Sequence, residues 1–500
     1  MSDALPTARP VRVRLAPSPT GALHVGTARA GLLNYLFAKR HGGSFILRIE
    51  DTDAERSQAI YTANILQGLQ ALGLSWDEGP SSTGEGELGE FGPYCQSQRK
   101  ARYQAVAHQL LAEGKAYRDF ITEAEIAQRR DEAQRLNQPF VYRSQALPPE
   151  AEAEKLAAGE PYSLRFAVPA TATTLTFTDS LRGEVSVEAS TVSDFVILKS
   201  DGMASYNFAV VVDDTDMAIT HVIRGEDHIP NTPRQVLLYE ALGKPLPLFT
   251  HLSMILAPDR SKLSKRFGAT AVSDYIYEQG FLPEAMVNFL ALLGWSHPEA
   301  KELLTLDELV ASFDLSRLST SGAVFDRTKL EWMNGQYIRQ LSLEELDKRC
   351  QPFWHALQAE PNRYTPAQRH ALLALVQESL VTLKDIDEQT ATFFGDALTT
   401  PADAELQASV LATPEGQQVL QQALTALHQL DDTTPETCHA WLKELSTALK
   451  PLKAKQVFWP LRAALTGRVQ GADLSGTLNL LGKQRIALRL QQACVSQVSL

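Results

Sequence analysis

The stretch that decides the fold spans residues 11–53 and runs VRVRLAPSPTGALHVGTARAGLLNYLFAKRHGGSFILRIEDTD. Val11–Ala16 is short and carries β-branched residues, which favours a buried strand. After a loop with two prolines, Ala28–Arg40 has apolar residues at helical spacing, and the pair of glycines that follows is typical of a helix end. Ser44–Ile49 has the composition of a second strand. The stretch therefore predicts a strand–helix–strand unit of a parallel sheet.

Polar side chains lie where these predicted strands end. Arg14 is near the end of the first strand, His24 follows in the loop, and Glu50 follows the second strand. Because ligands of open α/β sheets bind beyond the carboxyl ends of the strands, we expect these side chains to converge. Gly26 and Thr27 would add backbone N–H groups at a helix N-terminus, a place that suits phosphate. The four residues HVGT alone fit an ordinary βαβ unit equally well, since short motifs recur by chance.

Composition places the chain among ordinary folded proteins. Its 500 residues suggest three or four domains, and 44% hydrophobic with 21% charged residues allows several buried cores. The formal charge of −12 argues against a non-specific nucleic-acid binder. It does not exclude an enzyme of folded RNA, because recognition depends on local basic faces rather than on the total charge.

Cysteine usage and hydropathy favour a reducing cytoplasm. No apolar run approaches the ~20 residues of a membrane span, and the first residues resemble no secretory signal. The four cysteines lie far apart and form no CxxC or CxC pair, so we expect neither a disulfide framework nor a four-cysteine zinc site. They are Cys95, Cys350, Cys438 and Cys494.

The order of strand and helix signals predicts a chain in two halves. The N-terminal half is expected to be α/β, a Rossmann-type parallel sheet with an α+β insertion, and the C-terminal half all-α. Asn207–Val212 and Ile219–Ile223 are predicted as short strands that close the sheet. The expected domains are residues 1–100 and 201–258 for the two halves of the sheet domain, 101–200 for the insertion, 259–340 for a helical domain, and 341–500 for two helical bundles with a boundary near 395.

A second motif follows the last predicted strand. Lys262-Leu263-Ser264-Lys265-Arg266 places two lysines and a serine on a loop about 240 residues after HVGT. Two lysines on a mobile loop can meet negative charge as it develops on a departing pyrophosphate. An isolated string of this kind is more often a solvated basic turn.

Together, the two motifs resemble the class I aminoacyl-tRNA synthetases. HVGT, between PSPTG and IEDTD, resembles their HIGH motif, and KLSKR resembles their KMSKS loop. Along nearly its full length the chain is similar to the bacterial type of glutamyl-tRNA synthetase. The resemblance implies an AMP-forming ligase that converts glutamate and ATP to glutamyl-adenylate and pyrophosphate. It then transfers glutamate to the terminal adenosine of tRNA-Glu.

The resemblance also implies roles for single residues. A γ-carboxylate is best held by the planar fork of a guanidinium, which stays charged. Matching the family's motifs assigns glutamate binding to Arg14, Ala16, Ser18, Glu50, Tyr206 and Arg224. It assigns catalysis to His24, Gly26, Thr27, Lys262 and Lys265, and ATP binding to His24, Gly26, Asp227, Lys262, Ser264 and Lys265.

Cofactors and partners follow from the same resemblance. Mg²⁺ is expected to accompany ATP, held mainly by phosphate oxygens and water. The insertion would bind the acceptor end of tRNA and residues 341–500 the anticodon, and a monomer is expected. Some family members carry zinc in the insertion. Because Tyr117–Ile121 and Tyr142–Gln145 contain no soft ligand, we predict no zinc here.

Four other functions compete with this interpretation. Glutaminyl-tRNA synthetases share the N-terminal motifs, but their anticodon-binding part is a β-barrel, whereas the sequence beyond residue 340 is helical. A shortened paralogue that glutamylates a modified tRNA base lacks the C-terminal helices. A nucleotidylyltransferase would not need so long a chain after the KLSKR loop. A non-catalytic RNA-binding paralogue should have lost motif residues, yet His24, Gly26, Lys262 and Lys265 are present.

The choice of tRNA rests on one further position. Family members confined to tRNA-Glu often have an arginine in the helix that reads the third anticodon base, and Ser379 aligns there. A serine cannot supply the bidentate contact that favours one base. We therefore predict that the chain also charges tRNA-Gln, unless the alignment is off by a turn or another residue discriminates.

Overall fold

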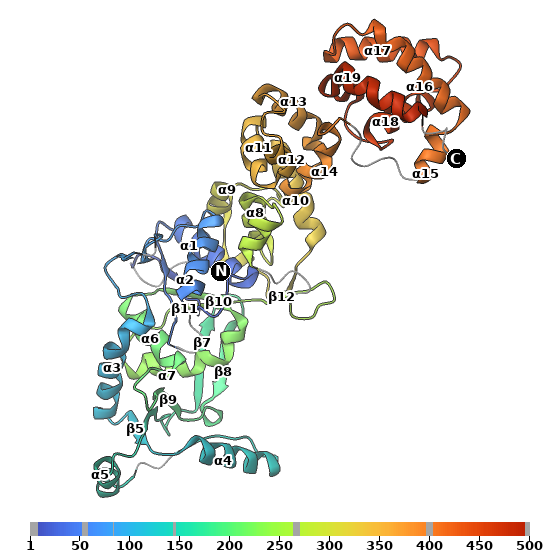
Figure 1. The fold of residues 1–500 in the computed structure, drawn as a ribbon. Helices are drawn as coiled ribbons and strands as arrows, with labels where there is room; N and C mark the ends of the chain where they lie inside the picture. The colour runs from blue at the N-terminus through green and yellow to red at the C-terminus, as the bar shows by residue number, and fades with distance from the viewer. Residues whose placement is uncertain are drawn as a thin grey trace. The chain divides into compact units, whose positions relative to one another are not determined.

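The computed structural model describes residues 9–52, 59–83, 85–143, 147–263, 271–396 and 404–495. The chain divides into two compact units. The N-terminal unit comprises Met1–Ile276 and Pro283–Arg327, and the C-terminal unit comprises Tyr277–Leu282 and Thr328–Leu500. The first unit contains the parallel strands and the second is helical (Figure 1). The predicted fold class is therefore confirmed.

The opening stretch folds as its sequence predicts. Strand β1 (Arg12–Leu15) pairs in parallel with β2 (Ser44–Leu47), and α1 (Val25–Arg40) connects them and packs on both. Gly42 follows the helix with φ of 60°, a left-handed conformation that ends helices and suits glycine. This unit brings the loop before α1 and the residues after β2 to the same edge of the sheet.

A second set of strands extends the same architecture. The order is β10–β11–β7–β8, parallel except for the last pair, which is an antiparallel hairpin. The bounds are β10 (His221–Gly225), β11 (Leu248–Leu252), β7 (Thr174–Asp179) and β8 (Gly183–Glu188). The backbone N–H of Thr220 donates to the Arg12 carbonyl at 2.9 Å, which places β10 beside β1.

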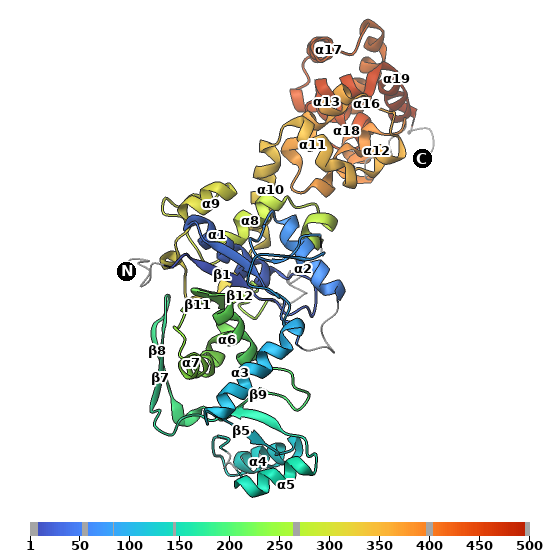
Figure 2. The ribbon, with the colours of Figure 1, turned by 90° about the vertical axis from the view of Figure 1, so that its left-hand side faces the viewer.

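One predicted strand is wrong. Asn207–Val212 lies in a helix, α6 (Tyr206–Asp216), in which Phe208–Asp214 are all buried. A helix covered on every side carries a continuous apolar run, and a short run of this kind cannot be told from a buried strand by periodicity. Figures 1 and 2 show α6 and α7 (Thr232–Ala241) on the opposite side of the strands from α1. The other prediction, a strand over Ile219–Ile223, corresponds to β10.

Besides these strands, the N-terminal unit contains a second sheet and further helices. A separate antiparallel sheet of order β5–β6–β9 forms within residues 101–200. Its strands are β5 (Ala116–Asp119), β6 (Ser163–Phe166) and β9 (Phe195–Leu198). The other helices are α2 (Ala59–Ala71), α3 (Lys100–Ala112), α4 (Glu123–Arg135), α5 (Pro149–Ala157), α8 (Pro283–Leu292) and α9 (Leu306–Ser312).

Hydrogen bonds and an ion pair join the segments where some family members would hold zinc. Tyr142 donates its hydroxyl hydrogen to Asp119 at 2.7 Å, and Arg165 pairs with the same carboxylate at 2.5 Å. Tyr117 donates to Asp194 at 3.1 Å. Within the described part of the chain, no group of three His, Cys, Asp or Glu side chains is placed to hold a metal ion. These side chains thus link β5, β6 and the residues before β9.

The C-terminal unit is a series of helices without a strand among its described residues. Trp354 is fully buried in it and donates its indole N–H to Thr390 at 2.9 Å. No described helix of either unit is long and apolar enough to span a bilayer. The helices are α10 (Arg327–Gln340), α11 (Leu343–Cys350), α12 (His355–Ala359), α13 (Pro366–Val376), α14 (Ile386–Thr390), α15 (Ala404–Leu406), α16 (Pro414–Ala426), α17 (Pro435–Ala448), α18 (Ala454–Thr466) and α19 (Leu474–Val495), the last interrupted at Gly482.

Candidate functional site

A pocket of about 720 Å³ opens at the carboxyl ends of the parallel strands. The structure brings together in its lining all the predicted catalytic, glutamate-binding and ATP-binding residues that it describes. They are Arg14, Ala16, Ser18, His24, Gly26, Thr27, Glu50, Tyr206, Arg224, Asp227 and Lys262. Two other predicted residues, Ser264 and Lys265, lie outside the described residues. Segments far apart in the chain thus converge beyond the carboxyl ends of the parallel strands, where open α/β sheets bind their ligands.

The N-terminus of α1 forms one wall of this pocket. His24 is its N-cap residue, with φ of −77° and ψ of 156°, and its side chain makes no capping hydrogen bond. The first backbone N–H groups of a helix have no partner within the helix and carry its positive dipole end. A Cβ added to Gly26 would meet no atom within 4 Å, so the missing side chain leaves space beside these donors. This wall suits a phosphate group.

Arg224 lines the pocket, and one nitrogen of its guanidinium has no partner among the described residues. It lies at the end of β10 and is only 6% exposed. Its Nη2 donates to Thr232 at 2.9 Å and to Gln235 at 2.8 Å, while its Nε lies 3.2 Å from His251 Nε2. Its Nη1 is buried and has no hydrogen-bond partner among the described residues. Burial lowers the pKa of Arg224. A buried cation with an unused donor favours a carboxylate ligand.

A second arginine and a carboxylate complete the charged lining. Arg14, 4% exposed, donates from Nε to the two Asp214 oxygens at 3.2 and 3.4 Å. Glu50 is 6% exposed and accepts from Arg48 Nη2 at 3.1 Å. Burial raises the pKa of Glu50, against the opposing effect of the Arg48 and Arg14 guanidinium groups. The pocket therefore has guanidinium groups that can bind a carboxylate and a carboxylate that can bind an ammonium group.

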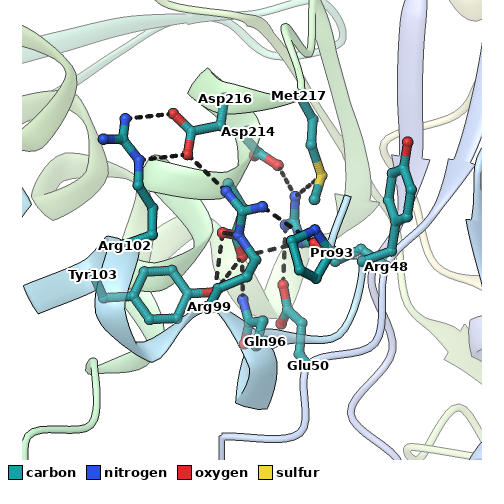
Figure 3. A network of polar contacts seen from close by, with 12 residues as sticks. Arg48, Glu50, Pro93, Gln96, Arg99, Arg102, Tyr103, Asp214, Asp216 and Met217 are labelled. Atoms are coloured by element: carbon teal, nitrogen blue, oxygen red, sulfur yellow. Dashed lines mark hydrogen bonds and ion pairs between the residues drawn. The ribbon is translucent and has the colours of Figure 1, made fainter. Parts of the chain in front are cut away.

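Behind this lining is a buried polar network that the sequence analysis did not predict (Figure 3). Arg48 is fully buried, and its Nη1 donates to Asp214 at 2.6 Å. Its Nε lies 3.7 Å from Asp213, which also accepts from Arg99 at 2.7 Å. Burial by itself would lower the pKa of Arg48. The carboxylates of Asp214, Asp213 and Glu50 outweigh this effect and raise that pKa well above its ordinary value. Both aspartates lie at the end of α6, so the helix mistaken for a strand supports the pocket.

Replacing Arg48 with methionine is expected to destabilise the N-terminal unit by about 3 kcal/mol. The variant leaves the buried carboxylates of Asp214, Asp213 and Glu50 without their shared cation. The matched control is Arg102→Met, which removes an arginine that pairs with Asp216 and whose side chain is 53% exposed. The control should cost about 1 kcal/mol or less. Urea unfolding of both variants measures the difference, and equal midpoints would show that the Arg48 network adds no stability.

Among the lining residues that the sequence analysis did not predict are Arg29, Glu226, His228 and Met254. Arg29 is buried on α1, donates to the Ser253 carbonyl at 2.7 Å, and has its pKa lowered to about 10 by burial. Tyr206 and His228 are joined by a hydrogen bond of 3.0 Å, and burial, together with nearby Arg224, lowers the pKa of His228 to about 4. Glu226 and His228 could have been predicted from their place in the chain, because they lie in the RGEDH stretch that begins with Arg224.

Comparison with known proteins gives a consistent result over the whole chain. Residues 10–332 match the model of the class I tRNA synthetase catalytic domain for E and Q, and residues 345–494 match an anticodon binding domain. The chain is 43% identical over 485 residues to the glutamate–tRNA ligase of Carboxydothermus hydrogenoformans, covering 96% of this chain and 99% of that one. It is 44% identical over 490 residues to that of Heliobacterium modesticaldum, covering 97% and 96%.

A solved structure is similar over the same extent. The glutamate–tRNA ligase of Elizabethkingia meningosepticum, determined in complex with its amino acid, matches with a TM-score of 0.88 and 34% identity. The match covers 97% of this chain and 99% of that chain.

Proposed function

The chain belongs to the glutamate–tRNA ligases of class I, and from this we propose that its pocket activates L-glutamate with ATP and transfers it to tRNA-Glu. The observation that carries the proposal is the pocket lined by Arg14, Arg224 and Glu50 beside the open N-terminus of α1. These charges complement the two carboxylates and the ammonium group of glutamate. The helix N-terminus complements a triphosphate.

In the first step, an α-carboxylate oxygen of glutamate attacks the α-phosphorus of ATP and pyrophosphate leaves. Arg224 and Arg14 hold the γ-carboxylate, and Glu50 receives the α-ammonium group. Ala16, Ser18 and Tyr206 line the same part of the pocket. The carboxylate is already a nucleophile, so no residue needs to remove a proton. Binding both substrates in one geometry makes the attack effectively unimolecular.

The phosphate side of the pocket stabilises the charge that moves onto pyrophosphate. His24 and the N–H groups of Gly26 and Thr27 meet the phosphates, and Lys262, together with Lys265, meets the leaving group. Asp227 and Ser264 contribute further contacts to ATP. Mg²⁺ bound to the triphosphate would neutralise part of its charge, with phosphate oxygens and water as its main ligands.

In the second step, the terminal ribose hydroxyl of tRNA attacks the carbonyl carbon of glutamyl-adenylate and AMP leaves. Residues 101–200 would receive the acceptor end and residues 341–500 the anticodon. The anticodon-binding role is supported by the family model matched over residues 345–494. We further propose that the chain acts as a monomer in the cytoplasm.

The tRNA choice is proposed to be relaxed, so that tRNA-Gln is charged as well. Ser379 is exposed in the 3₁₀ turn Gln377–Ser379 that follows α13, and it lines a cavity of about 100 Å³ in the C-terminal unit. A single hydroxyl supplies no bidentate contact to a base edge. Arg462 and Arg468 line the same cavity and are the candidates for discrimination if Ser379 has no part in it.

Aminoacylation with labelled glutamate and separate tRNA-Glu and tRNA-Gln transcripts tests both statements. Charging of both transcripts is expected. Charging of tRNA-Glu alone would support the proposed enzymatic function and would contradict the role proposed for Ser379. If the folded chain charged neither transcript, the proposed function would be wrong.

A further inference from the structure

The hairpin of β7 and β8 reaches from the inserted segment to the strand beside Arg224. Asp179, the last residue of β7, lies opposite Phe249 of β11. Its Oδ1 accepts hydrogen bonds from the backbone N–H groups of Leu181 (2.9 Å) and Arg182 (3.0 Å) in the hairpin turn. Asp179 is 1% exposed. Oδ1 therefore accepts its hydrogen bonds within the turn, and Oδ2 faces β11.

The second oxygen of Asp179 holds His251 at two points. Oδ2 accepts from the His251 backbone N–H at 3.0 Å and lies 2.7 Å from the ring Nδ1. His251 is fully buried, and burial lowers its pKa despite the neighbouring carboxylate. A neutral ring beside a carboxylate carries its hydrogen on the nitrogen that faces the carboxylate. His251 therefore has its hydrogen on Nδ1 and a lone pair on Nε2.

That lone pair faces Arg224. Nε2 lies 3.2 Å from Arg224 Nε, which can only donate, and 3.2 Å from the Thr232 hydroxyl. On the other branch of the guanidinium, Gln235 accepts from Nη2, and its own amide donates to Asn207 at 3.0 Å. The guanidinium is thus held at Nε and Nη2. Its Nη1 is buried and has no partner among the described residues, so it is the donor left for a ligand.

We propose that Asp179 and His251 are positioning residues that orient Arg224 toward the substrate's side-chain carboxylate. Asp179 fixes the tautomer of His251, and the Nε2 lone pair of His251 accepts from Arg224 Nε. The plane of the guanidinium is set before glutamate binds. The inference rests on the proposed function, and it makes a hairpin of the inserted segment part of amino-acid recognition.

Asp179→Asn is the first test. Oδ1 is fixed by two backbone donors, so the new amide NH₂ replaces Oδ2, where it faces the ring and leaves the His251 backbone N–H without its acceptor. His251 must then accept at Nδ1 and carry its hydrogen on Nε2, against the donor of Arg224. KM for glutamate in aminoacylation of tRNA-Glu is expected to rise about 30-fold, with KM for ATP unchanged. The control is Glu184→Gln, an exposed carboxylate of the same hairpin, which should leave both constants unchanged.

A matched pair at position 251 separates orientation of Arg224 from simple packing. In His251→Gln the amide oxygen reaches the place of Nε2 and restores an acceptor for Arg224. In His251→Asn the shorter amide reaches Asp179 but not Arg224. We expect KM for glutamate to rise at least about 10-fold more in the asparagine variant than in the glutamine variant.

These outcomes also distinguish the inference from the proposed function. If the unmodified chain charges tRNA-Glu while Asp179→Asn keeps the wild-type KM for glutamate, the inference is wrong and the function stands. If the unmodified chain charges no tRNA, the function itself fails. Thermal unfolding shows whether Asp179→Asn is folded. If it is not, the position-251 pair decides, and equal constants for glutamine and asparagine variants would overturn the inference.

Discussion

Replacing Arg224 with alanine should lower kcat/KM for glutamate by about 10,000-fold, because a buried carboxylate would lose its charge-assisted partner. Arg224 is 6% exposed, and its neighbours Thr232, Gln235 and His251 would face a cavity in its place. Arg224→Lys should recover only a small part of the activity, since an ammonium group cannot donate from a planar fork. Steady-state aminoacylation of tRNA-Glu measures all three proteins.

The control for this prediction is Arg234→Ala. Arg234 lies on α7 ten residues further along the chain and does not line the pocket. It should keep wild-type constants. A wild-type KM and kcat for the folded Arg224→Ala variant would remove Arg224 from substrate recognition, whatever the family of the chain.

The second large effect is expected at Lys262. Its backbone pairs with Leu256 in an isolated antiparallel bridge, and its exposed side chain reaches the pocket. An ammonium group at this place stabilises pyrophosphate most in the transition state, where the negative charge develops. Lys262→Ala should therefore lower the rate of adenylate formation by about 1,000-fold and leave the affinity for glutamate unchanged.

Single-turnover formation of glutamyl-adenylate in the presence of tRNA-Glu measures this rate directly. Lys244→Ala, an exposed lysine that follows α7, is the matched control and should react at the wild-type rate. Loss of glutamate affinity with an unchanged rate would show that Lys262 acts in binding rather than in the chemical step.

Local sequence patterns and motifs predicted those parts of the structure whose residues are close together in the chain. Residues 11–53 contain a strand, a helix start and a second strand, and each is set by its own sequence. The loop residues of this stretch then lie at the sheet edge by the rule for parallel strands. For this reason the lining positions of Arg14, His24 and Glu50 could be predicted without coordinates. Their roles in catalysis and binding remain predictions.

The supporting interactions could not be predicted because they join distant segments. Arg48 precedes the adjacent residues Asp213 and Asp214 by more than 160 positions, and they meet only when α6 lies beside the residue that follows β2. The strand predicted for Asn207–Val212 ended before both aspartates, whereas the helix that forms there continues through them and buries them. His251 has no motif around it. Its proposed role depends on Asp179, a residue of the β7–β8 hairpin 72 positions earlier.

The most direct test of how this pocket selects its substrate is ATP–pyrophosphate exchange in the presence of tRNA-Glu, with glutamate, glutamine or aspartate as the amino acid. Two buried arginines and the unused Nη1 of Arg224 predict exchange with glutamate. Glutamine, which leaves a buried cation unpaired, and aspartate, which is one methylene too short, should support at most about 1% of that rate. Equal exchange with glutamine, or no exchange with glutamate by folded protein, would contradict the assignment of the pocket.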